Sequence, residues 1–275
     1  MRANPPEVVL VNLVWFGVWD VSVLLLVLFG KRSSARIAAF RERVVAQWRP
    51  ALALAALAYV GVVARDITAG KATPGALVGD FLFPVSVFAQ ALIGFAIARG
   101  IPKFEPLPLV AAFGQRSFAR KVMLTSLITL VAAPTGLVLG SIGTSLGAGL
   151  AHESVRNEAV TSQFPANPVV AFLLLLAGAG IAEEVVYRLV ILSLVWRVTH
   201  SAWVAIVTAA LLHGLYHLTP LDSFYRQFWQ YPVAQVLGSV CISIVWGFLY
   251  VKRGLGSAIM GHTLSDWIGF MFLMR

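Results

Sequence analysis

The sequence predicts an all-α fold, namely a polytopic transmembrane helical bundle of about eight spans. Of its 275 residues, 59% are hydrophobic and only 12% are charged, whereas about a quarter of a typical soluble domain is charged. The mean hydropathy is correspondingly high, at +0.84. The apolar residues also gather in runs that approach or exceed the roughly 20 residues needed to cross a bilayer. Composition and segment length therefore both indicate a membrane protein.

Eight apolar segments qualify as spans. The first begins directly after a start that lacks the features of a cleavable signal. The fourth contains several glycines and a proline, so a break within it is one expectation, and the sixth is short. Glycine and proline are tolerated in spans where neighbouring groups satisfy the freed backbone. The predicted spans are residues 8–30, 50–65, 79–99, 121–150, 168–196, 202–218, 233–251 and 255–274.

Lysine and arginine are concentrated in alternate loops. Most of the 21 basic residues lie in the loops 31–49, 99–121, 197–201 and 252–254. The positive-inside rule places these loops in the cytoplasm and predicts a multi-pass protein of the cell membrane with both termini on the non-cytoplasmic side. The net charge of +9 is then a topology signal that also suits anionic lipid of the bilayer, and no nucleic-acid partner is expected. The single cysteine, Cys241, excludes an intrachain disulfide.

The fifth span, LLLLAGAGIAEEVVYRLVILSLVW, carries three charges in its middle. Ionisable residues inside spans are rare and are functional candidates by default. Glu184 and Arg188 have the i,i+4 spacing of an ion pair on one helix face. Glu183 lies on another face without a local partner, and a free carboxylate in a low-dielectric cavity is suited to act as a general base. The alternative is a polar clamp between helices.

Two further pairs of polar residues have i,i+4 spacing. His213 and His217 lie in the sixth span, with a spacing that suits either a metal or a polar cavity, but the zinc-hydrolase pattern HExxH is absent. In the eighth span, Asp266 is spaced to orient His262, or the two form a simple buried pair. Together with the charges of the fifth span, these groups are expected to line one wet cavity. Such a cavity would supply a water, a base and oxyanion donors for hydrolysis.

Straight helices would keep these groups apart. At 1.5 Å per residue, Glu183 lies near mid-membrane, His217 near the outer end of its span, and His262 about 10 Å from the cytoplasmic side. Tilted or short helices would bring them together, as would a re-entrant segment at 219–232. That segment is rich in aromatic residues, as interfacial stretches are.

Three motifs in this half of the chain resemble those of a known family. Glu183-Glu184-x-x-x-Arg188, then His217 ending an apolar helix, then His262-x-x-x-Asp266 are similar to the EExxxR, FxxxH and HxxxN/D motifs of the CPBP family. This family includes the type II CAAX prenyl endopeptidases (CAAX prenyl protease 2) and bacteriocin-processing or immunity-type membrane proteins. The resemblance covers about 168–275, the expected catalytic helical core with its cavity between the last four spans. Residues 1–167 would form N-terminal spans with basic cytoplasmic loops.

The resemblance implies a glutamate-based intramembrane endopeptidase. Glu183 together with His217 would activate the water, and His262 would stabilise the oxyanion. The Glu184–Arg188 pair would support them. The substrate would be a membrane-embedded or lipid-modified protein or peptide. The implied mechanism requires no metal or other cofactor.

Two departures from the family pattern leave alternatives open. His213 stands where the family usually has phenylalanine, and this spare histidine makes a zinc site conceivable. Asp266 occupies the second oxyanion position, where asparagine is common. Because an ionised aspartate cannot donate a hydrogen bond, Asp266 is either protonated or orients His262. The alternative metal ligands are His213, His217, His262 and Glu183.

Two other functions fit the same residues. One is a non-proteolytic immunity or regulatory protein on the same scaffold. The other is a proton-coupled transporter that uses the Glu, His and Asp side chains as a relay. The absence of a visible inverted repeat counts against the transporter. The sequence predicts neither the oligomeric state nor whether the substrate is prenylated.

Overall fold

The computed structural model describes residues 6–68, 70, 73, 80–155 and 164–273. Within these residues every regular element is helical, which confirms the predicted all-α class. Each of the eight predicted spans coincides with one helix or with a continuous run of helices. Residues 79 and 274, at the ends of two predicted spans, lie outside the described residues.

In the described residues, the first half of the chain forms four long or apolar helices, one surface helix and two short turns of helix. These are α1 (Pro6–Phe29) with the short 3-10 turn η1 (Gly30–Arg32), α2 (Ala35–Val45), α3 (Trp48–Thr68), α5 (Leu82–Ala98), the single turn α6 (Pro108–Ala111), and α7 (Phe118–Ala151).

The second half begins with one continuous helical run and continues through three further apolar helices. The run comprises α9 (Pro168–Leu175), the π-helical segments η2 (Leu176–Glu183) and η3 (Val185–Leu192), and α10 (Ser193–Thr199). It is followed by α11 (Ala202–Tyr216), the single turn α12 (Tyr225–Phe228), α13 (Pro232–Arg253), α14 (Leu255–Ile268) and the π-helical end η4 (Gly269–Leu273).

Five helical runs in the described residues are long and apolar enough to cross a membrane. They are Pro6–Arg32, Trp48–Thr68, Phe118–Ala151, Pro168–Thr199 and Pro232–Arg253. The apolar helices α5 and α11 are shorter, and α14 with η4 is the eighth apolar segment. This pattern is that of a multi-pass membrane protein. Large apolar side chains cover the outer faces of α1 and α7, as contact with lipid requires.

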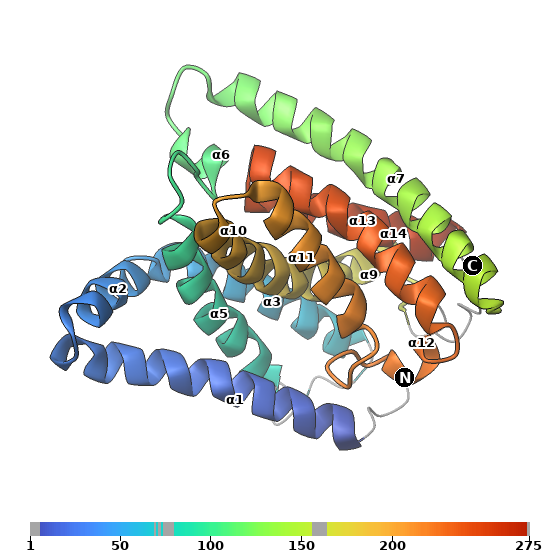
Figure 1. Ribbon diagram of the computed structural model, residues 1–275, viewed down its shortest axis with the longest axis horizontal. Coiled ribbons are helices and arrows are strands. Elements are labelled where there is room, and N and C mark those ends of the chain that lie inside the picture. The colour runs from blue at the N-terminus through green and yellow to red at the C-terminus, as the bar shows by residue number, and fades with distance from the viewer. Residues whose placement is uncertain (1–5, 69, 71–72, 74–79, 156–163, 274–275) are drawn as a thin grey trace.

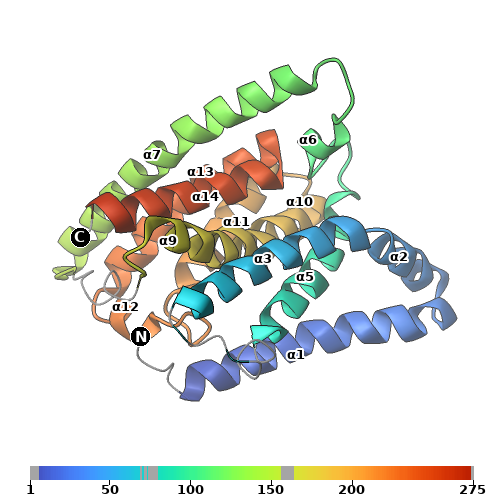
Figure 2. The same ribbon diagram turned by 180° about the vertical axis from the view of Figure 1, so that it is seen from behind.

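The helices form a bundle with α7 along one side and α1 along the other (Figures 1 and 2). Between them, α13 packs against α7, α11 and α14, while α5 packs against α1, α3 and η3. The buried core contains side chains from both halves of the chain, among them Phe95 of α5, Leu189 of η3 and Ile259 of α14. The predicted division after residue 167 remains a prediction.

The break considered for the fourth span does not occur, because α7 continues through Pro134 as one helix of 34 residues. Its glycines serve close packing instead. A Cβ at Gly136 would lie 2.6 Å from the ring of Trp246, and one at Gly143 would lie 2.6 Å from the carbonyl oxygen of Leu237. The glycines therefore let α13 approach α7 closely, as small residues commonly do between membrane helices.

The basic loops gather at one end of the bundle. The amide of Leu255 donates to the carbonyl of Pro106 at 2.8 Å, and Gly100 packs against the guanidinium of Arg197. At the opposite end, Trp267 donates to the carbonyl of Pro168 at 2.8 Å. This grouping agrees with alternate loops facing opposite sides. Which side faces the cytoplasm remains a prediction.

Candidate active site

The three charged residues of the fifth span lie in its π-helical part. The helical run that contains them begins with an N-cap. The side-chain oxygen of Asn167 accepts hydrogen bonds from the amides of Val169 and Val170. Its hydrogen bonding becomes π-helical from Leu176 to Glu183 and again from Val185 to Leu192. Such segments are rare and frequently occur at functional sites. Glu183 ends the first segment, Arg188 lies in the second, and Glu184 stands between them, so residues 176–192, here called the π-helical segment, carry all three charges.

Glu184 and Arg188 form the expected ion pair in the interior of the bundle. Arg188 Nε lies 3.2 Å from Glu184 Oε2, and both side chains are 0% exposed. Arg188 also donates through Nη2 to the hydroxyl of Ser243 on α13 at 2.9 Å. A buried arginine is tolerable only when it is paired and hydrogen-bonded. Glu184 supplies the counter-charge and Ser243 a hydrogen bond, while Arg188 Nη1 has no hydrogen-bond partner among the described residues.

Glu184 has a second partner that the sequence did not indicate. Its Oε1 lies 2.8 Å from Nδ1 of His262 on α14, so Glu184 connects Arg188 to His262. Asp266, for which an orienting role is one of the alternatives, lies 3.6 Å from His262 Nε2, beyond ordinary hydrogen-bond distance. The His262 ring is therefore oriented by the hydrogen bond between its Nδ1 and Oε1 of Glu184. Trp246 stacks on the same ring, with centroids 5.8 Å apart.

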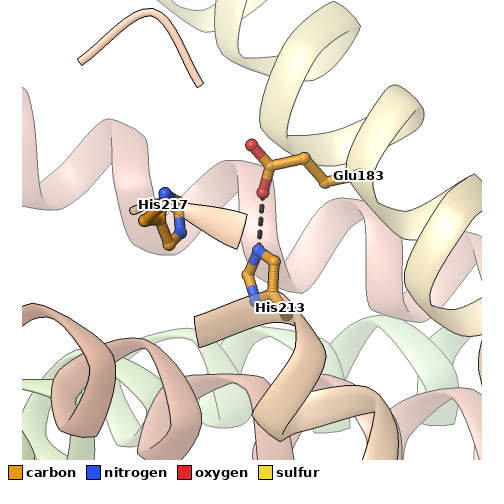
Figure 3. Close-up of side chains that lie close together, drawn as sticks. All are labelled: Glu183, His213 and His217. Atoms are coloured by element: carbon orange, nitrogen blue, oxygen red, sulfur yellow. Dashed lines mark hydrogen bonds and ion pairs between the residues drawn. The ribbon is translucent and has the colours of Figure 1, made fainter. Parts of the chain in front are cut away.

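Glu183 contacts His213 directly, as Figure 3 shows. Glu183 Oε2 lies 2.7 Å from His213 Nε2, and His262 Nε2 lies 4.0 Å from the same carboxylate oxygen. Three helical elements, η2, α11 and α14, thus contribute one side chain each to a single cluster. The separation expected from straight helices is not observed.

The shortness of α11 explains why the cluster can form. With 15 residues the helix spans only about 22 Å, less than the roughly 30 Å of a bilayer core. His217 caps its C-terminal end and therefore stays at the depth of the other groups. His217 Nδ1 lies 2.5 Å from Asp222 Oδ2 in the loop that follows. The resemblance pairs Glu183 with His217, whereas here Glu183 contacts His213 and His217 contacts Asp222.

Three of the four residues in the alternative metal site lie within coordinating reach of one another. Ligand atoms of Glu183, His213 and His217 are all within 4.8 Å of one another. Two imidazoles and a carboxylate are chemically suited to zinc. His213 and Glu183 are already joined by a hydrogen bond, so a metal would have to replace this contact.

Glu183 also faces a cavity of about 270 Å³. The cavity lies between α1, α5, the π-helical segment, the end of α11 and the loop at 221–223. Its walls include Trp15, Phe16 and Phe83 as well as the tyrosines Tyr187 and Tyr216. A carboxylate at the edge of a largely apolar cavity is a common arrangement in sites that bind and transform a substrate.

Sequence reasoning missed several residues that shape the cluster. Asp222 stood in the aromatic 219–232 segment, and its only signal was its place five residues after His217. Ser243 and Trp246 lie in the seventh span, which has no acidic, basic or histidine residue in its apolar part and so gave no signal. Only the packing of α13 against the π-helical segment and α14 shows their contacts.

The fold and the site together define a multi-pass helical membrane protein whose interior holds a cluster of carboxylates and imidazoles. Residues 165–268 match the family model described as type II CAAX prenyl endopeptidase Rce1-like. The match supports a membrane protease at the level of the family. All seven candidate residues, from Glu183 to Asp266, lie within the match. No curated protein and no solved structure shows a significant match to the chain.

Proposed function

We propose that this protein is a CAAX-type intramembrane endopeptidase in which Glu183 is the general base. The observation that carries the proposal is the position of Glu183. Its carboxylate is held by His213 at 2.7 Å, lies 4.0 Å from His262, and borders the cavity of about 270 Å³. A base in this position can reach a water and a substrate carbonyl inside the bilayer.

The reaction follows from the roles of these groups. Glu183 removes a proton from the water as its oxygen bonds to the carbonyl carbon of the scissile peptide. His262 lies within 4.0 Å of the carboxylates of Glu184, Glu183 and Asp266, and in its protonated form its Nε2–H donates to the oxyanion. The carbon–nitrogen bond then breaks, and Glu183 passes its proton to the leaving amine. The products are a carboxylate and an amine.

The remaining groups keep the base and the donor in place. His213 orients the Glu183 carboxylate through its Nε2 contact, and Glu184, neutralised by Arg188, fixes the ring of His262. His217 is within reach of the water as well, but its contact with Asp222 makes it a supporting residue in this proposal. No step requires a metal.

The test is hydrolysis of a farnesylated peptide that ends in a CAAX tail by the purified protein in lipid bilayers. We expect release of the three-residue tail, and we expect the Glu183→Gln protein to lose this activity while its unfolding profile stays unchanged. Hydrolysis that persists in Glu183→Gln would overturn the role of Glu183. A wild-type protein that cleaves neither this peptide nor its unprenylated counterpart would overturn the endopeptidase proposal for this substrate class.

A further inference from the structure

A pair of buried polar residues lies in the otherwise apolar helix α5. Ser86 is 0% exposed and Gln90 is 3% exposed. The two are one helical turn apart, and Gln90 Nε2 donates to Ser86 Oγ at 3.0 Å. Polar side chains at the depth of a membrane are costly and usually line a cavity or a pathway. The pair therefore requires an explanation beyond the packing of α5.

Ser86 and Gln90 line the same cavity as Glu183. They reach it from α5, which packs against η3 and α1, whereas Glu183 reaches it from the π-helical segment. The match to the Rce1-like family begins at residue 165, so this wall belongs to a part of the chain that the match does not cover. The first half of the chain thus contributes two polar groups to the space in front of the base.

The hydrogen-bonding capacity of Gln90 is only partly used. A glutamine side chain has two N–H donors and a carbonyl acceptor. One N–H is bonded to Ser86, and no described residue donates to the carbonyl oxygen. By contrast, Asn12 of α1, which also lines the cavity, donates to the carbonyls of Val8 and Leu221 and so has a structural role. Gln90 therefore has one donor and one acceptor left for a ligand in the cavity.

A peptide group presents the complementary acceptor and donor. A chain that is cleaved inside a membrane must unwind at the scissile bond, and its freed N–H and C=O groups then need partners, because no bulk water replaces the helical bonds. The walls at Trp15, Phe16 and Phe83 suit apolar groups, and outside α5 the polar side chains of the lining are Glu183, Asn12, Ser223, Tyr187 and Tyr216. Gln90 is thus the wall residue of α5 that can bind an unwound backbone.

We propose that Gln90, positioned by Ser86, binds a backbone peptide group of the substrate in the cavity opposite Glu183. The proposal rests on the proposed endopeptidase function and assigns a substrate-binding subsite to α5. It makes Gln90 a determinant of affinity for the peptide and leaves the chemistry at the scissile bond to the Glu183 cluster.

The test measures the Kd of a fluorescent farnesylated CAAX-tail peptide for the full chain carrying Glu183→Gln, so that no turnover is needed. Adding Gln90→Leu should raise the Kd about tenfold, the effect expected when a buried peptide group loses its partner. The control is Gln47→Leu, because Gln47 is also a buried glutamine but its side chain donates to the carbonyl of Arg43 at the α2–α3 junction, away from the residues that line the cavity. It should leave the Kd unchanged.

Peptides that are N-methylated at successive amides identify the group that is bound. We expect one methylated peptide to bind about tenfold more weakly than its parent to the chain with Gln90 and equally well to the chain with Gln90→Leu. Equal methylation penalties in both chains would overturn the proposal. An unchanged Kd in Gln90→Leu would overturn it too, as would an equal rise in the Gln47→Leu control.

Two further measurements distinguish a loss of peptide binding from a loss of folding or of catalysis. Gln90→Leu exchanges a polar group for an apolar one of similar size and should keep the thermal unfolding profile, while in the chain with Glu183 it should raise KM and leave kcat nearly unchanged. Ser86→Ala should raise the Kd by a smaller factor, because Gln90 loses its anchor but remains. If Glu183→Gln still cleaves, the proposed base is wrong, yet the binding comparison still tests Gln90.

Discussion

Glu184 lies 2.8 Å from His262 through Oε1 and 3.2 Å from Arg188 through Oε2, so one carboxylate serves two partners. It joins the π-helical segment to α14, and Arg188 extends the connection to Ser243 on α13. All of these side chains are buried. The arrangement makes Glu184 a structural centre of the site and Glu183, beside it in sequence, the group that faces the cavity.

Removal of the Glu184 charge should destabilise the protein. Glu184→Gln leaves Arg188 buried without a counter-ion, and we expect a loss of about 3–5 kcal/mol in the free energy of unfolding. The double variant Glu184→Gln, Arg188→Met should recover most of this loss, because neither charge then remains. Equilibrium unfolding in mixed micelles measures both. Wild-type stability in the single variant would contradict the pairing, and cleavage should stay low in the double variant because His262 has lost its charged partner.

The two histidines of α11 should differ in importance. His213→Phe introduces the residue that the family commonly has at this position and removes the partner of Glu183, so kcat should fall about 100-fold or more. His217→Phe removes a residue that contacts Asp222 and should lower kcat by a smaller factor. Steady-state hydrolysis of the farnesylated peptide measures both effects. The reverse order would show that His217 acts with Glu183, as the family resemblance implies.

The close approach of α14 to the π-helical segment should be sensitive to a single methyl group. A Cβ at Gly180 would overlap Oγ1 of Thr263, the residue next to His262, so Gly180→Ala should push the two helices apart. We expect a cost of about 1–3 kcal/mol in stability and a larger proportional loss of activity. Gly256→Ala is the matched control on α14, because a Cβ there has no heavy atom within 4 Å. Equal behaviour of the two variants in thermal unfolding and hydrolysis would refute the packing argument.

Metal removal tests whether Glu183, His213 and His217 hold a zinc ion. Because the proposed mechanism assigns the water to Glu183 alone, hydrolysis should survive dialysis against a chelator. The measurement combines elemental analysis of the purified protein with assays before and after chelation. Stoichiometric zinc, together with activity that is lost on chelation and restored by Zn²⁺, would instead assign the ion to Glu183, His213 and His217, whose ligand atoms lie within 4.8 Å of one another.

The fold class and the positions of the helices could be predicted from the sequence because a bilayer imposes a simple rule. Each span must be a long apolar helix, and this requirement leaves a signal in consecutive residues. The Glu184–Arg188 pair was predictable for a similar reason, since residues four apart share a helix face. The break considered within residues 121–150 does not occur. The glycines of this span pack against α13 instead, and this tertiary contact cannot be read from the sequence of α7 alone.

The cluster around Glu183 depends on distances that no local pattern contains. The sequence by itself determined that charges stand inside apolar helices and that Glu183 lacks a local partner. Only the tertiary structure decided that His213 is its partner, that Glu184 orients His262, and that Asp222 binds His217. It also brought Ser86 and Gln90 of α5 to the same cavity. Hydrophobic runs specify each helix separately, whereas helix length, tilt and close packing between glycines set which side chains meet.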